Sequence, residues 1–320
     1  MPASTGNPRR CGLRLGAILC AALVQAAACQ PGSQQFHPPL KAPVQVGVIQ
    51  CPAVVESSGL AASPRRGGMY WTINDSGGSA TLYALDSSGK DLGQVRLKGC
   101  SNVDWEDIAF DEAGRLYVAD TGDNRRRRPD VVIYVLDEPE PRGEAPVRGK
   151  VRFRFPPDVG PIDCEGMFVR KGWAYLVTKE LIQARLYRVP VDKLGEGVLQ
   201  AQPLGSLPEA VWITGADLSP DGRHVAMISY SAVYVYDLPE PIEDLVAARA
   251  AASVLAAGAA PSPSPASRAI TVSPRKRLVS LRQSEAICWV RGQSCTDLLI
   301  TNEQRDIYCV RPLAASRPAE

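Results

Sequence analysis

The sequence predicts an all-β fold, a β-propeller of five four-stranded blades. A short phrase, an acidic residue near the start of an apolar strand, recurs at Glu56-Ser-Ser-Gly-Leu-Ala, Glu106-Asp-Ile-Ala-Phe, Glu165-Gly-Met-Phe-Val, Ala216-Asp217-Leu-Ser-Pro and Glu285-Ala-Ile-Cys-Trp. A second apolar strand that ends in polar residues follows each copy. Short strands that repeat about every 50 residues are typical of propellers.

The strands of four blades follow in chain order. The first blade is predicted at 56–62, 69–74, 80–85 and 92–97, and the second at 106–110, 115–119, 131–136 and 151–155. The third takes 165–169, 173–178, 185–189 and about 203–207, and the fourth takes 213–218, 223–229, 232–237 and about 278–281. Turn residues such as Asp111-Glu-Ala-Gly114 separate them.

The fifth blade has three strands left, at 285–290, 297–302 and 306–311. Its fourth strand is expected from the N-terminal segment 44–50. Closing the ring in this way removes sheet edges that would otherwise pair with other chains.

Three further segments surround or interrupt the propeller. Residues 1–28 form a predicted signal peptide, with arginines before the apolar run 15–24 and small residues before Cys29. Residues 29–43 are expected to be a flexible tether, and the propeller domain spans 44–320. An insertion at about 239–277 combines an Ala-rich helix with a Pro-Ser linker.

The signal peptide predicts export by one of two routes. Cleavage before Cys29 would give a lipid-anchored cell-envelope protein, although Ala26 replaces the usual Leu of a lipoprotein signal. Cleavage near the Ala run would release a periplasmic or secreted protein. Contact with a membrane is expected only through a lipid on Cys29, and the protein is expected to be a monomer.

Removing the signal peptide and assigning Cys29 to a lipid leaves six cysteines. An even number suits disulfides in an exported chain. The candidate pairs are Cys100 with Cys164 and Cys288 with Cys295, with Cys51 and Cys309 as the alternative. Buried free thiols are the other interpretation.

Composition excludes several function classes. The formal net charge of +2 argues against a nucleic-acid surface. The only histidines, His37 and His224, lie in a Pro-rich stretch and inside a strand. A Ser-His-Asp triad or a His-rich zinc site is therefore not expected.

The repeat predicts an acidic ring at one face of the propeller. The connections into the first strand and between the second and third strands of each blade lie on the same face. The acids at the starts of the first strands are Glu56, Asp104, Glu106, Asp107, Asp163, Glu165, Asp217 and Glu285. The polar residues at the ends of the second strands are Asn74, Asp75, Asp120, Asp123, Asn124, Lys179, Glu180, Ser229, Tyr230, Asn302 and Glu303. Such carboxylates repel one another unless some are protonated or a cation lies among them. Ca²⁺ is the predicted cofactor because it prefers loosely arranged oxygen ligands.

Specific roles are predicted for thirteen ring residues. The catalytic candidates are Glu106, Glu165, Asp217 and Glu285. The substrate-binding candidates are Arg125 and Lys179, which would neutralise an anion, and Trp105, which would stack on it. The metal-ligand candidates are Glu56, Asp104, Asp120, Asp123, Asn124 and Glu303. Local turn formation is the alternative role for the acids.

The motifs Asp104-Trp-Glu-Asp-Ile-Ala, Gly122-Asp-Asn, Thr214-Gly-Ala-Asp-Leu-Ser-Pro-Asp-Gly222 and Ser284-Glu-Ala-Ile resemble those of an uncharacterised family of exported bacterial β-propellers. The resemblance covers the chain from about residue 50 and implies fold and export more than activity. More distantly, the ring is similar to phytase-like and esterase-like propellers.

Two functions stay open at this point. The ring could serve a metal-dependent hydrolase of phosphate esters or other small anionic substrates. Alternatively, the chain is a non-catalytic, lipid-anchored binding or scaffold propeller with a structural ion and an unknown protein partner. Activity that responds to added Ca²⁺ would separate them. A cofactor-dependent dehydrogenase is disfavoured because no cofactor-binding motif is found.

Overall fold

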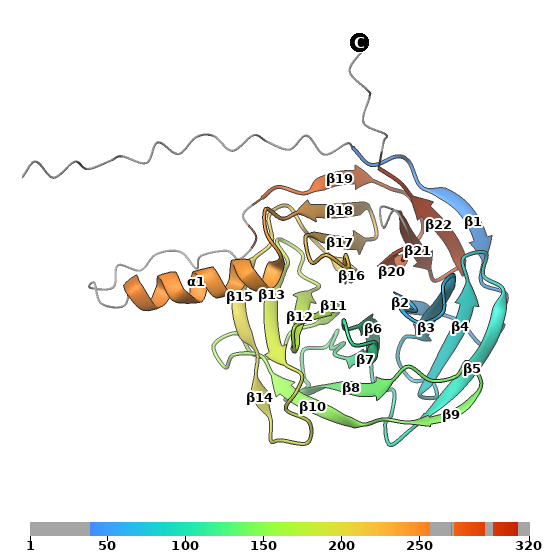
Figure 1. Ribbon diagram of the computed structural model, residues 1–320, viewed down its shortest axis with the longest axis horizontal. Coiled ribbons are helices and arrows are strands. Elements are labelled where there is room, and N and C mark those ends of the chain that lie inside the picture. Colours follow the sequence, from blue (N-terminus) through green and yellow to red (C-terminus); the bar gives the residue numbers. More distant parts are fainter. Residues whose placement is uncertain (1–38, 257–269, 271, 292–296, 313–320) are drawn as a thin grey trace, which may run out of the picture. The chain divides into compact units, whose positions relative to one another are not determined.

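The computed structural model describes residues 39–256, 270, 272–291 and 297–312. All of them belong to one compact unit that spans residues 37–320. Their regular structure is almost entirely β, in five sheets that form a ring (Figure 1). The predicted five-bladed propeller is confirmed.

Each blade has its first strand nearest the axis. The first blade contains β2 (Ser57–Ala62), β3 (Met69–Asn74), β4 (Thr81–Asp86) and β5 (Asp91–Lys98). The second contains β6 (Trp105–Phe110), β7 (Arg115–Asp120), β8 (Val131–Asp137) and β10 (Gly149–Arg154). The inner strands are buried on both faces, whereas β5 and β10 alternate buried and exposed residues because their second face meets solvent.

The next two blades repeat this order. The third contains β11 (Cys164–Arg170), β12 (Trp173–Thr178), β13 (Arg185–Pro190) and β15 (Gln202–Ser206). The fourth contains β16 (Ile213–Leu218), β17 (His224–Ser229), β18 (Ala232–Asp237) and β19 (Arg275–Leu278). Of these eight strands, β19 departs most from its predicted bounds and begins earlier in the chain.

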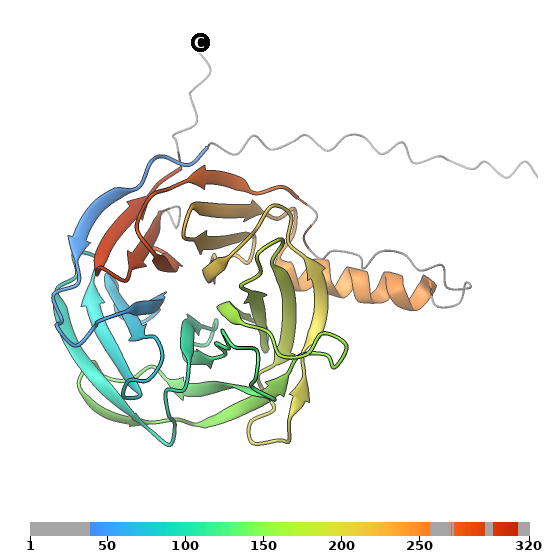
Figure 2. The same ribbon diagram turned by 180° about the vertical axis from the view of Figure 1, so that it is seen from behind.

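The fifth blade is closed by the N-terminal strand, as predicted. It contains β20 (Ser284–Trp289), β21 (Leu298–Asn302) and β22 (Asp306–Val310), and β1 (Val44–Val48) pairs antiparallel with β22. Figure 2 shows β1 lying along the outer edge of the ring beside β22.

Two short strands were not expected. β9 (Gly143–Pro146) pairs parallel with β5, and β14 (Leu199–Gln200) pairs parallel with β10. Each extends the outer edge of the preceding blade with residues from a later connection. Backbone hydrogen bonds at the outer rim thereby join the first blade to the second and the second blade to the third.

The insertion in the fourth blade contains a helix. α1 (Ile242–Ala256) lies between β18 and β19, with Pro241 before it and acids in its first turn. Ile242 and Val246 are buried in the same apolar cluster as the third and fourth blades. In the described part of the chain, no helix is long and apolar enough to span a membrane.

The apolar core is divided among the blade interfaces. Five clusters of buried residues each join two neighbouring blades, and one of them joins the fifth blade to the first. The ring is therefore held together between sheets, and the innermost strands are fixed on both sides. Residues 1–38, which include the predicted signal peptide, Cys29 and most of the tether, lie outside the described residues.

Candidate metal centre

A β-bulge opens the first strand of every blade at the mouth face, the face where the predicted acidic connections lie. The pairing of the first with the second strand shifts register near the start of β2, β6, β11, β16 and β20. The residues at the shift are Ser58, Glu106, Glu165, Thr214 and Glu285. Bulges redirect a side chain out of the strand alternation. Three blades use this position to present a glutamate.

The first group of acids is buried. Glu106, Asp163 and Glu165 are 3%, 6% and 2% exposed, and one carboxylate oxygen from each lies within 4.8 Å of the others. Asp163 also accepts a hydrogen bond from the backbone N–H of Asp123 at 2.8 Å, which fixes its position. We call these three residues the acid pit.

A second group shares Glu106 with the acid pit. Carboxylate oxygens of Asp75, Asp104 and Glu106 lie within 4.8 Å of one another. Gly122 lies directly against this group: a Cβ there would be 2.0 Å from Glu106 Oε1 and 2.7 Å from Asp104 Oδ2. A glycine is required because any side chain at residue 122 would displace these carboxylates.

One lysine lies among the acids. Lys179 Nζ donates hydrogen bonds to Glu165 Oε1 at 2.7 Å and to the Tyr230 hydroxyl at 3.0 Å. Burial lowers the pKa of Lys179, but the Glu165 carboxylate and the hydrogen bonds to Glu165 and Tyr230 outweigh it and raise the pKa above its ordinary value, so this side chain remains a cation. The other oxygen, Glu165 Oε2, is buried and has no hydrogen-bond partner. A buried carboxylate oxygen without a partner is costly and marks a place for a ligand.

The pKa values of the acids show how strongly they affect one another. Burial raises the pKa of Glu106 well above its ordinary value, and Glu165, Asp75, Asp104 and Asp163 raise it further. Burial also raises the pKa of Glu165, although Lys179 opposes this. Burial together with Asp75 and Asp163 raises the pKa of Asp104 to about 6.

Glu285 lies on the fifth blade near the same lysine. Burial raises its pKa to about 8, Lys179 lowers it, and Glu303 raises it. Glu303 is half-buried and accepts a hydrogen bond from Gln283. Glu56 is exposed, but its charge raises the pKa values of Asp75 and Glu303. Both predicted ligands therefore lie at the rim, outside the two grouped sets.

Asp217 does not occupy the position that the sequence predicts. Thr214 is at the bulge of β16, three residues earlier, and donates a hydrogen bond to the backbone oxygen of Ser284. The Asp217 carboxylate instead accepts backbone N–H groups of Leu218 and Trp289, both at 2.8 Å. Asp217 therefore joins the fourth and fifth blades. The prediction that it contributes a carboxylate to the acidic ring was wrong, because it lies three residues after the bulge position.

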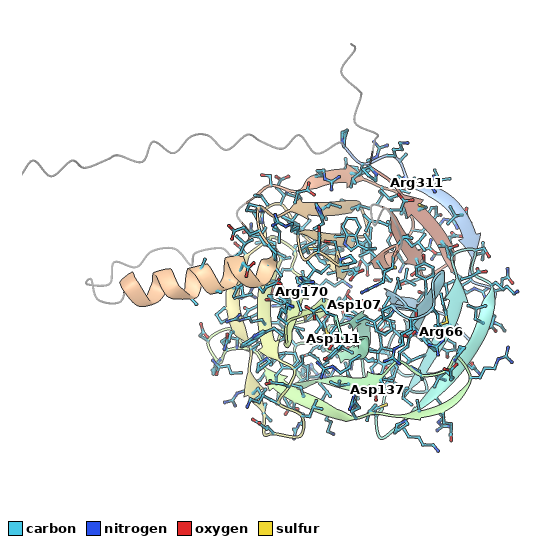
Figure 3. The ribbon with its side chains drawn as sticks, in the orientation of Figure 1. Arg66, Asp107, Asp111, Asp137, Arg170 and Arg311 are labelled. Carbon is cyan, nitrogen blue, oxygen red and sulfur yellow. The ribbon has the colours of Figure 1, made fainter. Side chains whose placement is uncertain are left out.

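Asp107 also accepts backbone N–H groups from other blades, as Asp217 does. Asp107 is fully buried near the centre of the ring (Figure 3) and accepts backbone N–H groups of Ile108, Met167 and Ala216 at 2.8, 2.8 and 3.1 Å. Burial raises the pKa of Asp107, and these three N–H groups lower it. One side chain thus connects the innermost strands of three blades.

The loop after β7 has a structural role. Asp120 accepts hydrogen bonds from Arg128 and from the backbone of Asp104, and Asp123 accepts the backbone N–H groups of Arg127 and Arg128. These are turn-forming contacts, the alternative given above for such residues. The Asp120 and Asp123 carboxylates, both predicted as metal ligands, are thus engaged in hydrogen bonds within the loop. Its remaining candidates, Asn124 and Arg125, are exposed.

Two further expectations are corrected. Trp105 is fully buried, donates its indole N–H to the backbone oxygen of Ser101, and packs near Tyr134, so it cannot stack on a substrate. Cys51, Cys100, Cys164 and Cys309 are free thiols, so neither the Cys100–Cys164 nor the Cys51–Cys309 pair forms here. Cys295 lies outside the described residues.

Two of the grouped residues, Asp75 and Asp163, received no specific role from the sequence, and two others, Glu106 and Glu165, were predicted as catalytic residues and not as ligands. Asp75 and Asp163 both belong to the predicted ring, at the end of a second strand and just before a first strand. Asp163 precedes Glu165 by two residues, as Asp104 precedes Glu106, and this repeated Asp-x-Glu spacing was a usable signal.

The stability of the cation-free protein should fall as pH rises from 5 to 8. The folded protein keeps protons on Asp104 and Glu285 at pH values where the unfolded chain has released them, since their pKa values are raised to about 6 and about 8. Stability therefore decreases with pH across that window. Asp86 and Asp221, whose pKa values are lowered, release their protons below it. Thermal unfolding in chelator across this range is the measurement, and Glu285→Gln should flatten the slope. A melting temperature that rises with pH would contradict it.

Comparisons with known proteins give only distant structural similarity. No family model and no curated protein matches the sequence. Similar solved structures include Myxococcus xanthus glutaminyl cyclase, with 13% identity, a TM-score of 0.46, and coverage of 86% of this chain and 97% of that one. A gluconolactonase from Xanthomonas campestris has 12% identity, a TM-score of 0.43, and coverage of 87% and 95%. Kuenenia stuttgartiensis hydrazine synthase has 15% identity, a TM-score of 0.38 and coverage of 80%, and this chain spans 59% of it.

Proposed function

We propose that this chain is an exported propeller that binds a divalent cation, preferably Ca²⁺, in its acid pit and hydrolyses esters of small anionic substrates. Glu106, Asp163 and Glu165 would hold the cation, and Asp75 and Asp104 would add oxygen ligands through their contact with Glu106. Carboxylates alone, without cysteine or imidazole, suit a hard cation such as Ca²⁺.

The observation that carries the proposal is the unpartnered oxygen of Glu165. The acid pit and the second group together contain five carboxylates. Lys179 pairs with one of them, through Glu165 Oε1, and so offsets one negative charge. Glu165 Oε2 is left buried without a partner, within a cluster of like charges. A bound cation would satisfy this oxygen and remove the repulsion that raises these pKa values.

The surrounding side chains suit hydrolysis. A divalent cation in the acid pit would polarise a carbonyl or phosphoryl oxygen. Lys179 is a fixed positive charge that attracts an anionic substrate, and its hydrogen bond holds the Tyr230 hydroxyl. Burial raises the pKa of Glu285 to about 8, close to neutral pH, so this carboxyl group can accept a proton from an attacking water and return it.

Thermal unfolding with Ca²⁺ and with chelator, combined with an ester and phosphoester panel, tests this function. At a hundredfold excess over its dissociation constant, a ligand stabilises the fold by about 2.7 kcal/mol. For a domain of this size that corresponds to a rise in melting temperature of about 4–5 °C. Hydrolysis that requires Ca²⁺ would support the enzyme. An unchanged melting temperature would contradict the cation site itself.

The test also separates the alternative function. A rise in melting temperature without turnover of any ester would favour a binding or scaffold propeller with a structural ion. Export through residues 1–28, a lipid on Cys29 and the monomeric state remain parts of the proposal. Mass spectrometry of the mature N-terminus would decide between the two cleavage routes.

A further inference from the structure

An exposed apolar patch borders the acidic mouth on the third and fourth blades. Leu181, Ile182 and Trp212 are 70%, 88% and 43% exposed. Leu181 and Ile182 lie in the connection between β12 and β13, and Trp212 directly precedes β16. Both connections lie on the mouth face. We call these three residues the apolar lip.

Backbone hydrogen bonds hold the two segments of the lip together. The N–H of Ala184 donates to the oxygen of Ala210, and the N–H of Trp212 donates to the oxygen of Glu180, both at 2.8 Å. Glu180 is itself paired with Arg126 and Arg185. The lip is therefore a fixed surface, and its nearest carboxylate is already neutralised.

A chain of contacts connects the lip to the acid pit. The Trp212 ring meets the Tyr230 ring edge-on with centroids 5.9 Å apart. The Tyr230 hydroxyl accepts a hydrogen bond from Lys179 at 3.0 Å, and Lys179 contacts Glu165 at 2.7 Å. A molecule with its polar group at Lys179 and Glu165 would thus have its adjoining part against Trp212.

The backbone of Trp212 is strained. Its φ of +49° lies in the left-handed region, which a bulky residue rarely adopts. The side chain remains substantially exposed, so burial of the indole returns little stability to the fold. A strained, exposed aromatic residue beside a buried polar site points to a ligand contact.

We infer that the substrate carries an apolar group, such as an alkyl acyl chain of four or more carbons, that lies on the apolar lip while its polar group enters the acid pit. This inference rests on the proposed function and adds the substrate class. This surface has a polar region of acids and Lys179 at the axis and an apolar region of exposed aliphatic and indole groups beside it. That arrangement matches an amphipathic small molecule.

The test compares binding of acetate and hexanoate in the presence of Ca²⁺ by titration calorimetry, using the full mature chain. We expect hexanoate to bind the wild type at least about tenfold more tightly than acetate, because each additional buried methylene favours binding. Ile182→Ser and Trp212→Gly should each reduce that ratio to below about threefold. Trp212→Gly also relieves the φ strain, so its melting temperature should not fall.

Leu278→Ser is the matched control, since Leu278 is 72% exposed on β19 at the outer edge of its blade. It should keep the wild-type ratio. Equal binding of the two carboxylates, or a ratio that Ile182→Ser and Trp212→Gly leave unchanged, would overturn the inference. So would loss of binding to neutral phosphatidylcholine vesicles in Ile182→Ser without any chain-length effect, which would indicate a membrane contact instead.

Failure of the proposed function gives a different result. Chain-length-dependent hexanoate binding without ester turnover would support the lip and contradict the hydrolase. Turnover with Ca²⁺ but no chain-length dependence would support the hydrolase and contradict the lip.

Discussion

Glu106→Gln is expected to abolish most of the stabilisation of the protein by Ca²⁺. Glu106 belongs to both grouped sets of carboxylates, so its loss removes a ligand that the two share. The rise in melting temperature with Ca²⁺, about 4–5 °C in the wild type, should fall below about 1 °C. In chelator at pH 8 the variant should be more stable than the wild type, because one buried charge has been removed from the cluster.

Any Ca²⁺-dependent hydrolysis should decrease at least about 100-fold in Glu106→Gln, since even the loss of a group that only orients a metal ligand can cost about that much. Glu196→Gln is the control, an exposed glutamate paired with Lys193 in the loop after β13. It should respond as the wild type does. A Glu106→Gln protein that Ca²⁺ stabilises as strongly as the wild type would place the cation elsewhere.

Asp107→Ala is expected to cause a large loss of stability. The substitution leaves the N–H groups of Ile108, Met167 and Ala216 buried without an acceptor. Each unsatisfied buried group costs about 1–3 kcal/mol, so the free energy of unfolding should fall by about 3–5 kcal/mol. The corresponding fall in melting temperature is about 5–8 °C.

Denaturant unfolding of Asp107→Ala, followed by circular dichroism, is the measurement. Asp137→Ala is the control because Asp137 is exposed and its ion pair with Arg148 lies at the surface, where such pairs contribute little. It should differ from the wild type by less than about 0.5 kcal/mol. An Asp107→Ala protein within about 1 kcal/mol of the wild type would show that other contacts hold the three blades together.

The blades could be predicted from sequence because their strands are apolar runs at a regular spacing. β9 and β14 could not, since Gly143-Glu-Ala-Pro146 and Leu199-Gln200 carry no apolar run and pair with strands of the preceding blade. These two strands form because the outer strand of the preceding blade, β5 or β10, offers an unpaired edge beside them, and that position is set by the folded ring.

The candidate site was predictable only in part, for two physical reasons. The bulge of each first strand adds a residue that sequence spacing does not show, so Asp217 was aligned with Glu106 although Thr214 occupies that position. In addition, a carboxylate that forms a turn and one that binds a cation have the same residue type. Asp123 and Asp163 differ only in the donors around them, and those come from the fold.

The closure by β1 has a consequence for how the chain folds during synthesis. β1 leaves the ribosome first, but its partner β22 lies about 260 residues later, as in the pair Val44 with Cys309. Val44, Val46 and Val48 must therefore wait, unpaired, until the last blade is complete. Pairing over such a separation is slow because the loop entropy is lost before the contacts form. The open ring, with the first four blades formed and the fifth still lacking its outer strand, should therefore be the slowest state to convert to the native fold.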